Sequence, residues 1–349
     1  MEKILTLIIP TYNAEKFLDK GLTSFIMDDT KLMDELEVLV VIDGSPDRSI
    51  DVAQKYVDRY PNTFRIIDKE NGGHGSGINV GSKNATGKYF KVIDADDWVD
   101  TESLVRFMHL LENEDCEAII SSYTTYDISK DEYEHRKVHM DDYDRYYNLA
   151  DILANWDDMH LGMSFHGVTY NTKFYCDQKY DVVEKAFYED QEYATIPLCR
   201  ATKIKILDDE LYQYRIGDVN QSVSTASQLN KLPDFEKVLF KMMEFESELD
   251  TLPVGGAEYW TRKVSKFIAD VYQITLVKNT DKKSKRQYVK DLNRRINEKS
   301  PRVYGFVKNK YRVFVILNRM HMSDETYNGA FSKVLDFARR HFNVQRLYG

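Results

Sequence analysis

The sequence predicts an α/β protein whose mostly parallel sheet carries helices on both faces, followed by a C-terminal helical region. Three observations support this class. Strand-like and helix-like segments alternate through about the first 125 residues, and the strand-like segments are almost continuously apolar. From about residue 228 onward, apolar residues recur with helical spacing alone. Alternation of this kind with apolar strands is typical of a parallel sheet that is buried on both faces.

The individual elements follow from these patterns. Strands are expected at Leu5–Ile9, Glu37–Ile42, Phe64–Ile67, Tyr89–Ile93 and Ala118–Ser122, with helices at about 14–26, 49–60, 76–84 and 101–112. Residues 126–150 are polar and are expected to be irregular, whereas 151–226 mix short helices with strands such as Phe165–Tyr170 and Leu211–Arg215. Further helices are expected near 228–249, 257–278, 281–297, 302–320 and 325–341. We therefore expect one domain over 1–226, with halves of about 1–125 and 126–226, and a helical region over 227–349.

Composition narrows the class of protein. The 349 residues are 42% hydrophobic and 13% aromatic, which indicates a well-buried core and argues against disorder. No apolar run approaches the roughly 18 residues of a membrane span. The three cysteines form no CxxC pair, which favours a reduced, cytoplasmic compartment and argues against zinc.

The net charge of −9 conceals an asymmetry, because residues 261–349 hold 21 Lys and Arg against 7 Asp and Glu. One interpretation of this basic region is a solvated helical surface. The other is a surface that attracts anionic lipid or a phosphate-bearing acceptor. Nucleic acid is not expected, since the region lacks a recognisable reader motif.

Polar clusters follow four of the predicted strands. They are Thr11-Tyr12-Asn13, Asp43-Gly44-Ser45, Asn71-Gly72-Gly73 and Asp94–Asp97. Ligands of parallel sheets bind at the carboxyl ends of the strands, so these four loops predict one binding edge. Asp43 is placed to accept the imide N–H of a uracil, Tyr12 to stack on a base, and the glycines to let the backbone approach a ligand closely.

Asp94 and Asp96 are separated by one residue at the end of a strand, where both can turn toward a ligand. Hard oxygen ligands suit Mg²⁺ or Mn²⁺, which proteins usually hold with one or two carboxylates plus substrate phosphates. The alternative is that Asp96 and Asp97 only cap the helix that begins near Thr101.

Four segments carry a resemblance to a known family: IIPTYNAEKFL, VVIDGSPDRS, ENGGHGSGINVG and VIDADDW. In this order and at these separations they resemble the nucleotide-sugar-binding half of the family 2 glycosyltransferases, over roughly residues 3–225. The resemblance implies the A-type glycosyltransferase fold, a Rossmann-like α/β domain. It also implies an activity that transfers a hexosyl or N-acetylhexosaminyl group from a nucleotide-diphosphate sugar.

The resemblance assigns roles to particular residues. Asp94 and Asp96 match the family's DxD motif, with Asp96 the direct ligand of Mn²⁺ or Mg²⁺, and Glu189 and Asp190 match its acidic pair near the acceptor. By this likeness Asp190 is the base that takes the acceptor proton during inversion; the alternative role is a charge that favours a helix N-terminus. The expected nucleotide-sugar contacts are Pro10, Thr11, Tyr12, Asn13, Glu15, Asp43, Asn71, Gly73, Asp94, Ala95, Asp96 and, at the diphosphate, Arg215.

Two further residues are candidates for contact with the sugar or acceptor. His166 lies on the predicted strand before the acidic pair, and a buried, hydrogen-bonded histidine is its alternative role. Trp98 stands beside the DxD motif, and packing is its alternative role.

Two departures from the family limit what the resemblance implies. The family commonly has Ala-Arg before the Asn of its third loop, where this chain has Gly77-Ile78 before Asn79. The contact made by that arginine is therefore missing, which leaves the nucleotide less defined. The chain also lacks a QxxRW motif, which argues against a processive synthase.

The expected function is therefore metal-dependent, inverting transfer of one sugar, UDP-linked, to a hydroxyl of a glycan or lipid-linked acceptor in surface-polysaccharide synthesis. A sugar-phosphate nucleotidyltransferase and a non-catalytic nucleotide- or glycan-binding module are the alternatives. We expect a cytoplasmic protein, with the basic C-terminal helices docked peripherally on the anionic inner face of the membrane. The apolar face would consist of Tyr304, Phe306, Val307, Tyr311, Val313, Phe314 and Leu317, beside the basic residues Lys308, Lys310 and Arg312. Burial of that face against another helix or a second subunit of a homo-oligomer is the alternative.

Overall fold

The computed structural model describes residues 2–218, 225–279, 281, 283–323 and 326–327. The chain divides into two compact units, the first comprising Met1–Asp218 with Glu248–Ala257 and the second Val219–Ser247 with Glu258–Gly349. The assignment of residues 1–226 to one catalytic domain and of residues 227–349 to a helical region remains a prediction.

The first half of the sheet is parallel, as predicted. Its strand order is β3-β2-β1-β4, and each neighbouring pair is parallel. The strands are β1 (Leu5–Thr11), β2 (Leu36–Asp43), β3 (Phe64–Lys69) and β4 (Tyr89–Val92). Every residue of β1, β2 and β4 is buried, which is why these segments have almost continuous apolar sequences. Their carboxyl ends meet at one edge of the sheet.

The second half of the sheet is mixed rather than parallel. It continues as β9-β6-β10-β5, with β7 beside β6 and β8 beside β10. Strand β9 is antiparallel to both neighbours, while β6 and β10 are parallel. The strands are β5 (Trp98–Val99), β6 (Ala118–Asp127), β7 (Glu132–Arg136), β8 (Tyr146–Tyr147), β9 (Val168–Asn171) and β10 (Ile204–Ile216).

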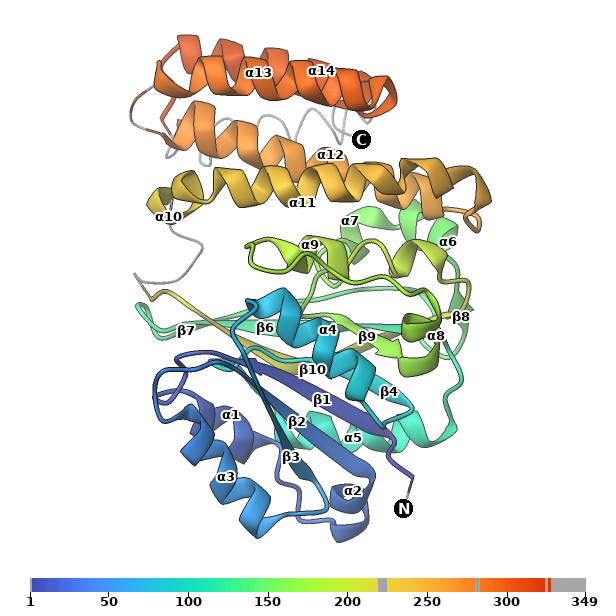
Figure 1. Cartoon of the computed structure of the whole chain (residues 1–349). Coiled ribbons are helices and arrows are strands. Elements are labelled where there is room, and N and C mark those ends of the chain that lie inside the picture. Colours follow the sequence, from blue (N-terminus) through green and yellow to red (C-terminus); the bar gives the residue numbers. More distant parts are fainter. Residues whose placement is uncertain (1, 219–224, 280, 282, 324–325, 328–349) are drawn as a thin grey trace. The chain divides into compact units, whose positions relative to one another are not determined.

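Helices cover both faces of this sheet (Figure 1), which confirms the predicted fold class. Helix α4 (His74–Asn84) lies on one face, and α1 (Leu18–Ser24), α3 (Ser49–Arg59) and α5 (Thr101–Asn113) lie on the other. The remaining helices of the unit are short: α2 (Thr30–Glu35), α6 (Leu149–Ala154), α7 (Trp156–Met159), α8 (Thr172–Asp177), α9 (Glu189–Tyr193) and η1 (Leu198–Arg200). The side chain of Asp100, not that of Asp96 or Asp97, caps α5 by accepting from the Ser103 N–H. The capping alternative for Asp96 and Asp97 is therefore wrong.

Two local expectations also require correction. Residues 126–150 contain strand β7, which pairs with β6 although its residues are polar and mostly exposed. The strand expected from Phe165 begins only at Val168, because backbone hydrogen bonds from Gly167 and Val168 to Ser164 close a turn there. His166 therefore lies in a turn and not on a strand.

The second unit is helical, as predicted. Its helices are α10 (Thr225–Asn230), α11 (Leu232–Glu244), α12 (Gly256–Tyr272, apart from its first two residues), the π-helix η3 (Gln273–Lys278), α13 (Ser284–Lys299) and α14 (Pro301–Arg319). The helix η2 (Phe245–Thr251), after α11, spans the boundary between the two units. Ser300 caps α14 by accepting from the Val303 N–H at 2.9 Å, and Pro301 occupies the first turn. The helix expected at 325–341 lies outside the described residues. No helix in the described ranges is both long and apolar enough to cross a membrane.

Candidate active site

The loop after β2 and the loop after β3 are joined through Asp43, the last residue of β2. Its two carboxylate oxygens accept the backbone N–H groups of Gly72, at 2.8 Å, and Gly73, at 2.7 Å. The Lys69 ammonium pairs with the same carboxylate, and the Asn71 side chain donates to the Asp43 carbonyl at 2.9 Å. Because each carboxylate oxygen has two lone pairs, Asp43 still has acceptor capacity for a base.

The end of β1 lies beside these loops. Pro10 packs against α4, where a Cβ on Gly77 would approach the Pro10 Cβ to 2.7 Å. Thr11 is buried, and its hydroxyl donates to the Ile9 carbonyl at 2.9 Å. Tyr12 is 56% exposed, so its ring is available to stack on a planar ligand.

The loops after β1 and β2 are also tied together. The Asn13 N–H donates to the Ser45 hydroxyl at 2.7 Å, and the Glu15 N–H donates to Asp47 at 2.8 Å. Partial burial alone would raise the pKa of Asp47, but hydrogen bonds from the Ser45 and Ser49 hydroxyls lower it to about 2. The Glu15 carboxylate itself accepts from the Arg48 N–H at 3.2 Å.

The carboxylates after β4 lie at the same edge. Asp94 Oδ1 pairs with Nε2 of His74, the first residue of α4, at 2.9 Å. The other ring nitrogen of His74, Nδ1, lies 2.6 Å from Glu189 Oε1. Burial alone would lower the pKa of His74, but Asp94 and Glu189 raise it well above its ordinary value. The imidazole is therefore a cation held between two carboxylates. Ala95, next to Asp94, is half-buried.

Asp97 forms a buried network behind this edge. The Tyr212 hydroxyl donates to Asp97 Oδ2 at 2.6 Å, and the backbone N–H of Arg215 donates to Oδ1 at 2.7 Å. Burial, together with the charges of Asp94 and Asp96, raises the pKa of Asp97 well above its ordinary value. The Arg215 guanidinium lies 3.4 Å from Asp96 and 3.0 Å from Asp218.

His166 completes the acidic cluster. Asp94, Asp97 and His166 each offer a ligand atom within 4.8 Å of the other two. Burial lowers the pKa of His166 to about 4, so its imidazole is neutral. Its ring stacks on Tyr214 with centroids 4.0 Å apart, and its Nδ1 is buried without a hydrogen-bond partner among the described residues. His166 is therefore buried at this atom, as the alternative role expects, and a contact with the sugar or acceptor stays a prediction.

This donor set fits the divalent ion that the sequence predicts. Asp94, Asp97 once it has released its proton, and the neutral imidazole of His166 would be suitable ligands for Mn²⁺, and the carboxylates alone for Mg²⁺. The orphaned His166 Nδ1 is the observation that favours an additional ligand here. Asp96 is not part of this three-residue group and pairs with Arg215. Its assignment as the direct metal ligand stays a prediction.

The predicted acidic pair begins helix α9. Glu189 is only 6% exposed and contacts His74, whereas Asp190 is half-buried and accepts from the Gln191 side chain at 3.0 Å. Tyr188, directly before the pair, has a positive φ of 76°. The pair therefore lies close to the carboxylates after β4, although it is about a hundred residues away in sequence.

Trp98 lies apart from these polar contacts. The Lys20 ammonium stands 3.0 Å from the centroid of its ring, and the Tyr126 ring meets it edge-on at 5.9 Å. These contacts support the packing role for Trp98.

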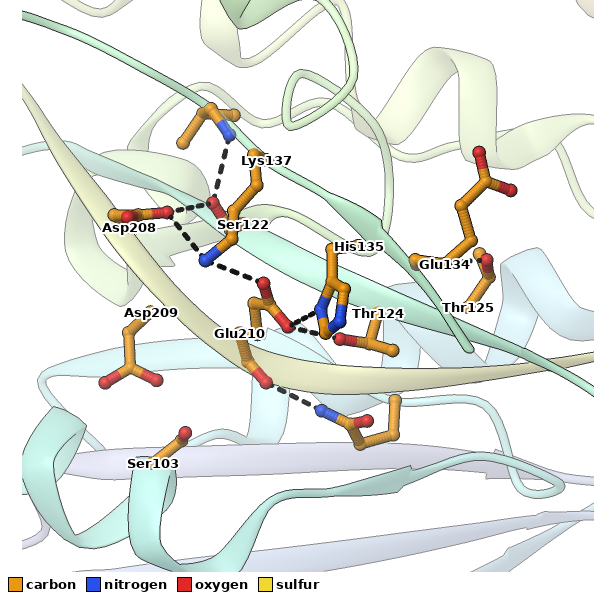
Figure 2. Close-up of polar contacts among 12 residues, drawn as sticks. Ser103, Ser122, Thr124, Thr125, Glu134, His135, Lys137, Asp208, Asp209 and Glu210 are labelled. Atoms are coloured by element: carbon orange, nitrogen blue, oxygen red, sulfur yellow. Dashed lines mark hydrogen bonds and ion pairs between the residues drawn. The ribbon is translucent and has the colours of Figure 1, made fainter. Parts of the chain in front are cut away.

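A cavity of about 660 Å³ is lined by side chains from α5, β6, β7 and β10, among them Thr124, His135 and Glu210. Figure 2 shows the polar contacts among these side chains. On β6, Tyr123 contacts His166 while the next residue, Thr124, hydrogen-bonds to Glu210 at 2.5 Å. Successive strand residues point to opposite faces, which separates this cavity from the cluster at His166. Its charged side chains pair with one another: Lys137 with Asp208 and Glu210, His135 with Glu210, and Arg106 with Asp209.

Two basic residues of the site had not been identified from the sequence. His74 lies in a glycine-rich stretch of the sequence. Lys91 lies in the apolar strand β4, and its ammonium donates to the His166 carbonyl at 2.6 Å. Neither residue has a periodic signal. Ile78 occupies the position, directly before Asn79, where the family commonly has an arginine. His74 lies one helical turn before Ile78 and on the same side of α4. Only the folded chain brings Asp94 and Glu189 to its two ring nitrogens, so no local pattern around His74 marks it as a site residue.

Comparison with known proteins supports the architecture. Residues 6–172 match the family described as glycosyl transferase family 2. The crystal structure of S. aureus TarS 1–349 in complex with UDP-GlcNAc has a TM-score of 0.64 and 19% identity, and covers 91% of this chain and 92% of that one. At that identity the likeness shows the fold.

Two relatives by sequence are much longer proteins. Glycosyltransferase GlyA of Streptococcus pneumoniae is 24% identical over 220 residues, 61% of this chain and 30% of the relative. The minor teichoic acid biosynthesis protein GgaB of Bacillus subtilis is 34% identical over 112 residues, 31% of this chain and 12% of the relative. The chain thus spans less than a third of the length of either. Its residues 6–172 belong to glycosyl transferase family 2, and the unit that contains them has the A-type glycosyltransferase fold.

Proposed function

We propose that this glycosyltransferase moves one sugar, with inversion, from a UDP-sugar to a hydroxyl of a surface-polymer acceptor. The observation that carries the proposal is the meeting of Asp94 and the Glu189-Asp190 pair at one sheet edge, joined through His74. The A-type fold supports a nucleotide-sugar donor. We propose UDP as the nucleotide and a hexosyl or N-acetylhexosaminyl group as the sugar because a TarS structure contains UDP-GlcNAc. We propose a surface polymer as the acceptor because GgaB is described as a teichoic acid biosynthesis protein.

The nucleoside would bind against the loops after β1, β2 and β3. Tyr12 offers an exposed ring for the base, and Asp43 offers a carboxylate for the imide N–H of uracil. Asn13, Glu15, Asn71 and Gly73 belong to the same hydrogen-bonded loops, while Pro10 and Thr11 form the end of β1 beneath them. The shared hydrogen bonds hold these loops in place before the nucleotide arrives.

The diphosphate would bind at the carboxylates after β4. A divalent ion, Mn²⁺ or Mg²⁺, offsets the charge that develops on a departing diphosphate. Asp94, Asp96, Asp97 and His166 are the residues that would hold it. Arg215, 3.4 Å from Asp96, would exchange that partner for a phosphate oxygen.

Asp190 would act as the base on the acceptor side. The acceptor oxygen attacks the anomeric carbon from the face opposite the diphosphate, and Asp190 takes the hydroxyl proton as the new C–O bond forms. The old C–O bond breaks, and its electron pair leaves with the nucleoside diphosphate. This single displacement inverts the anomeric configuration.

The test uses the whole chain and a panel of UDP-, GDP- and dTDP-sugars with and without Mn²⁺. Parent protein is expected to release UDP from a UDP-sugar only with the metal, and Asp190→Asn to lower that rate by about 10²-fold or more while UDP still binds. Equal rates in the parent and in a folded Asp190→Asn variant would contradict the proposal. A nucleotidyltransferase would instead form a UDP-sugar from UTP and a sugar phosphate, and a binding module would bind without turnover.

Membrane contact is a further part of this proposal, with a corrected surface. Val307, Phe314 and Leu317, expected on the membrane face, are buried within the helical unit. The exposed large apolar residues of α14 are Phe306 and Ile316, and Met320, directly after the helix, is exposed as well. Together with Arg302 they occupy one helical face, which suits an anionic membrane surface that displays a lipid-linked acceptor.

A further inference from the structure

His74 joins two carboxylates that lie far apart in the sequence. Asp94 is 20 residues after it and Glu189 is 115 residues after it, yet both contact its ring, at 2.9 and 2.6 Å. Both ring nitrogens are used, one for each carboxylate. Glu189 is only 6% exposed, so loss of the histidine would leave a buried carboxylate without this partner.

The contact is part of a longer junction between α4 and the segment that leads into α9. The Asn79 amide donates to the Val182 carbonyl and accepts from its N–H, both at 3.0 Å. The Lys185 N–H donates to the Gly72 carbonyl at 2.8 Å. Gly75 lies so close to this segment that a Cβ there would be 2.2 Å from the Val183 carbonyl oxygen. Helix α4 therefore supports residues 182–189 along most of their length.

The segment is also folded back onto its own helix. The carboxylate of Glu192, which is fully buried, accepts from the Val183 N–H at 2.9 Å and from the Tyr180 hydroxyl. Tyr188 takes a left-handed backbone conformation, which a non-glycine residue adopts only when its surroundings hold it there. The direction in which the Asp190 side chain points from α9 thus depends on the contacts of Glu189 and Glu192.

We propose that His74 is a positioning residue that couples the donor site to the acceptor base. By holding Asp94 and Glu189 on its two nitrogens, it fixes the first turn of α9 so that Asp190 faces the sugar carbon. This inference rests on the proposed function. It assigns to His74 no contact with the substrate, so its loss should affect turnover rather than donor affinity.

The kinetic test compares His74→Gln with Lys83→Gln in the full-length chain. Lys83 also links α4 to the same segment, through a 2.6 Å ion pair with Asp181, but at the exposed end of the helix. With the UDP-sugar that the parent hydrolyses, H74Q should lower kcat by about 30-fold or more and leave KM within about threefold, since general-base assistance is worth on the order of 10²–10⁴-fold. K83Q should keep both values within about twofold, as expected for an exposed ion pair.

A double-mutant cycle with Glu189→Gln tests the coupling. If the two side chains act as one unit, H74Q/E189Q should lose no more activity than the worse single variant. The double variant also removes the buried charge, so it remains informative if H74Q alone fails to fold.

Hydrogen exchange supplies a readout without substrate. H74Q should speed amide exchange in residues 183–193 and leave the β6–β7 hairpin, residues 118–136, unchanged. Three results would overturn the inference: kcat of folded H74Q within about threefold of the parent, a raised KM at unchanged kcat, or multiplicative losses in the double variant. A parent that neither binds UDP with Mn²⁺ nor hydrolyses any UDP-sugar would instead refute the proposed function.

Discussion

The Tyr212 hydroxyl donates a 2.6 Å hydrogen bond to Asp97, a carboxyl that is only 2% exposed. The same hydroxyl accepts the backbone N–H of Asp94 at 3.1 Å. A buried aromatic side chain on β10 thus sets the turn that presents the carboxylates after β4.

Asp97 should make the stability of the metal-free protein depend on pH. Burial and the charges of Asp94 and Asp96 raise its pKa well above the ordinary 3.8, so the folded state keeps a proton that the unfolded chain releases. Its contribution to stability is complete below about pH 4 and decreases as pH rises toward the folded pKa. Asp97→Asn cannot titrate. The unfolding free energy of D97N minus that of the parent, measured with denaturant in EDTA, should therefore increase from pH 4 to pH 8; a flat difference would contradict the assignment.

Lys91 should make the stability of the protein depend on pH in the alkaline range as well. Its side chain is fully buried and donates to the carbonyls of His166, at 2.6 Å, and Val168, at 3.2 Å. Burial lowers its pKa from 10.5 to about 7. Between these values the unfolded chain binds a proton that the folded chain lacks, so its contribution to stability rises with pH across that window and is constant below about pH 7. Relative to Lys91→Met, the parent should gain stability from pH 7 to pH 10; equal slopes for the two proteins would refute this.

Asp43 should control nucleotide binding through the third loop. Asp43→Ala removes the acceptor for the Gly72 and Gly73 N–H groups and the expected contact with the base. Charged hydrogen bonds are worth about 1.5–3 kcal/mol each, so calorimetry should show UDP binding weakened by about 10- to 100-fold. Asp68→Asn, at an exposed carboxylate on β3, is the matched control and should bind UDP as the parent does.

The exposed face of α14 should govern any binding to vesicles. The test variant is Ile316→Asp in the full-length chain, at a side chain that is 55% exposed. The control variant is Val254→Asp, which places an aspartate at a 74% exposed position outside this helix. I316D should reduce co-sedimentation with vesicles containing phosphatidylserine, and V254D should not, because only the first adds charge to the apolar face. Failure of the parent to sediment with anionic vesicles would remove membrane contact from the proposal.

The N-terminal half of the sheet was predictable because its signals are local. Strands such as β2 are buried on both faces, so their apolar sequences mark them directly, and polar residues appear where each strand ends. The start of α9 at Glu189 also agrees with the expectation that an acidic pair heads a helix.

The features that were not predicted depend on distant partners. Strand β7, with the sequence EYEHR, has no apolar pattern and owes its form to pairing with β6. Helix α2 has six residues, too few for a period to show. His74 has no signal of its own, because Glu189 follows 115 residues later. Likewise, only the folded sheet brings His166 beside Asp94 and Asp97.

The central claim is that the edge after β4 holds a divalent ion and a diphosphate opposite Asp190. A crystal grown with UDP and MnCl₂, with diffraction measured at the manganese edge, tests it most directly. The account predicts one anomalous peak within about 2.5 Å of a carboxylate oxygen of Asp94, Asp96 or Asp97, with the UDP diphosphate bound to it and the base near Tyr12 and Asp43. UDP bound at another place on the unit, or bound here with no anomalous peak, would contradict the account.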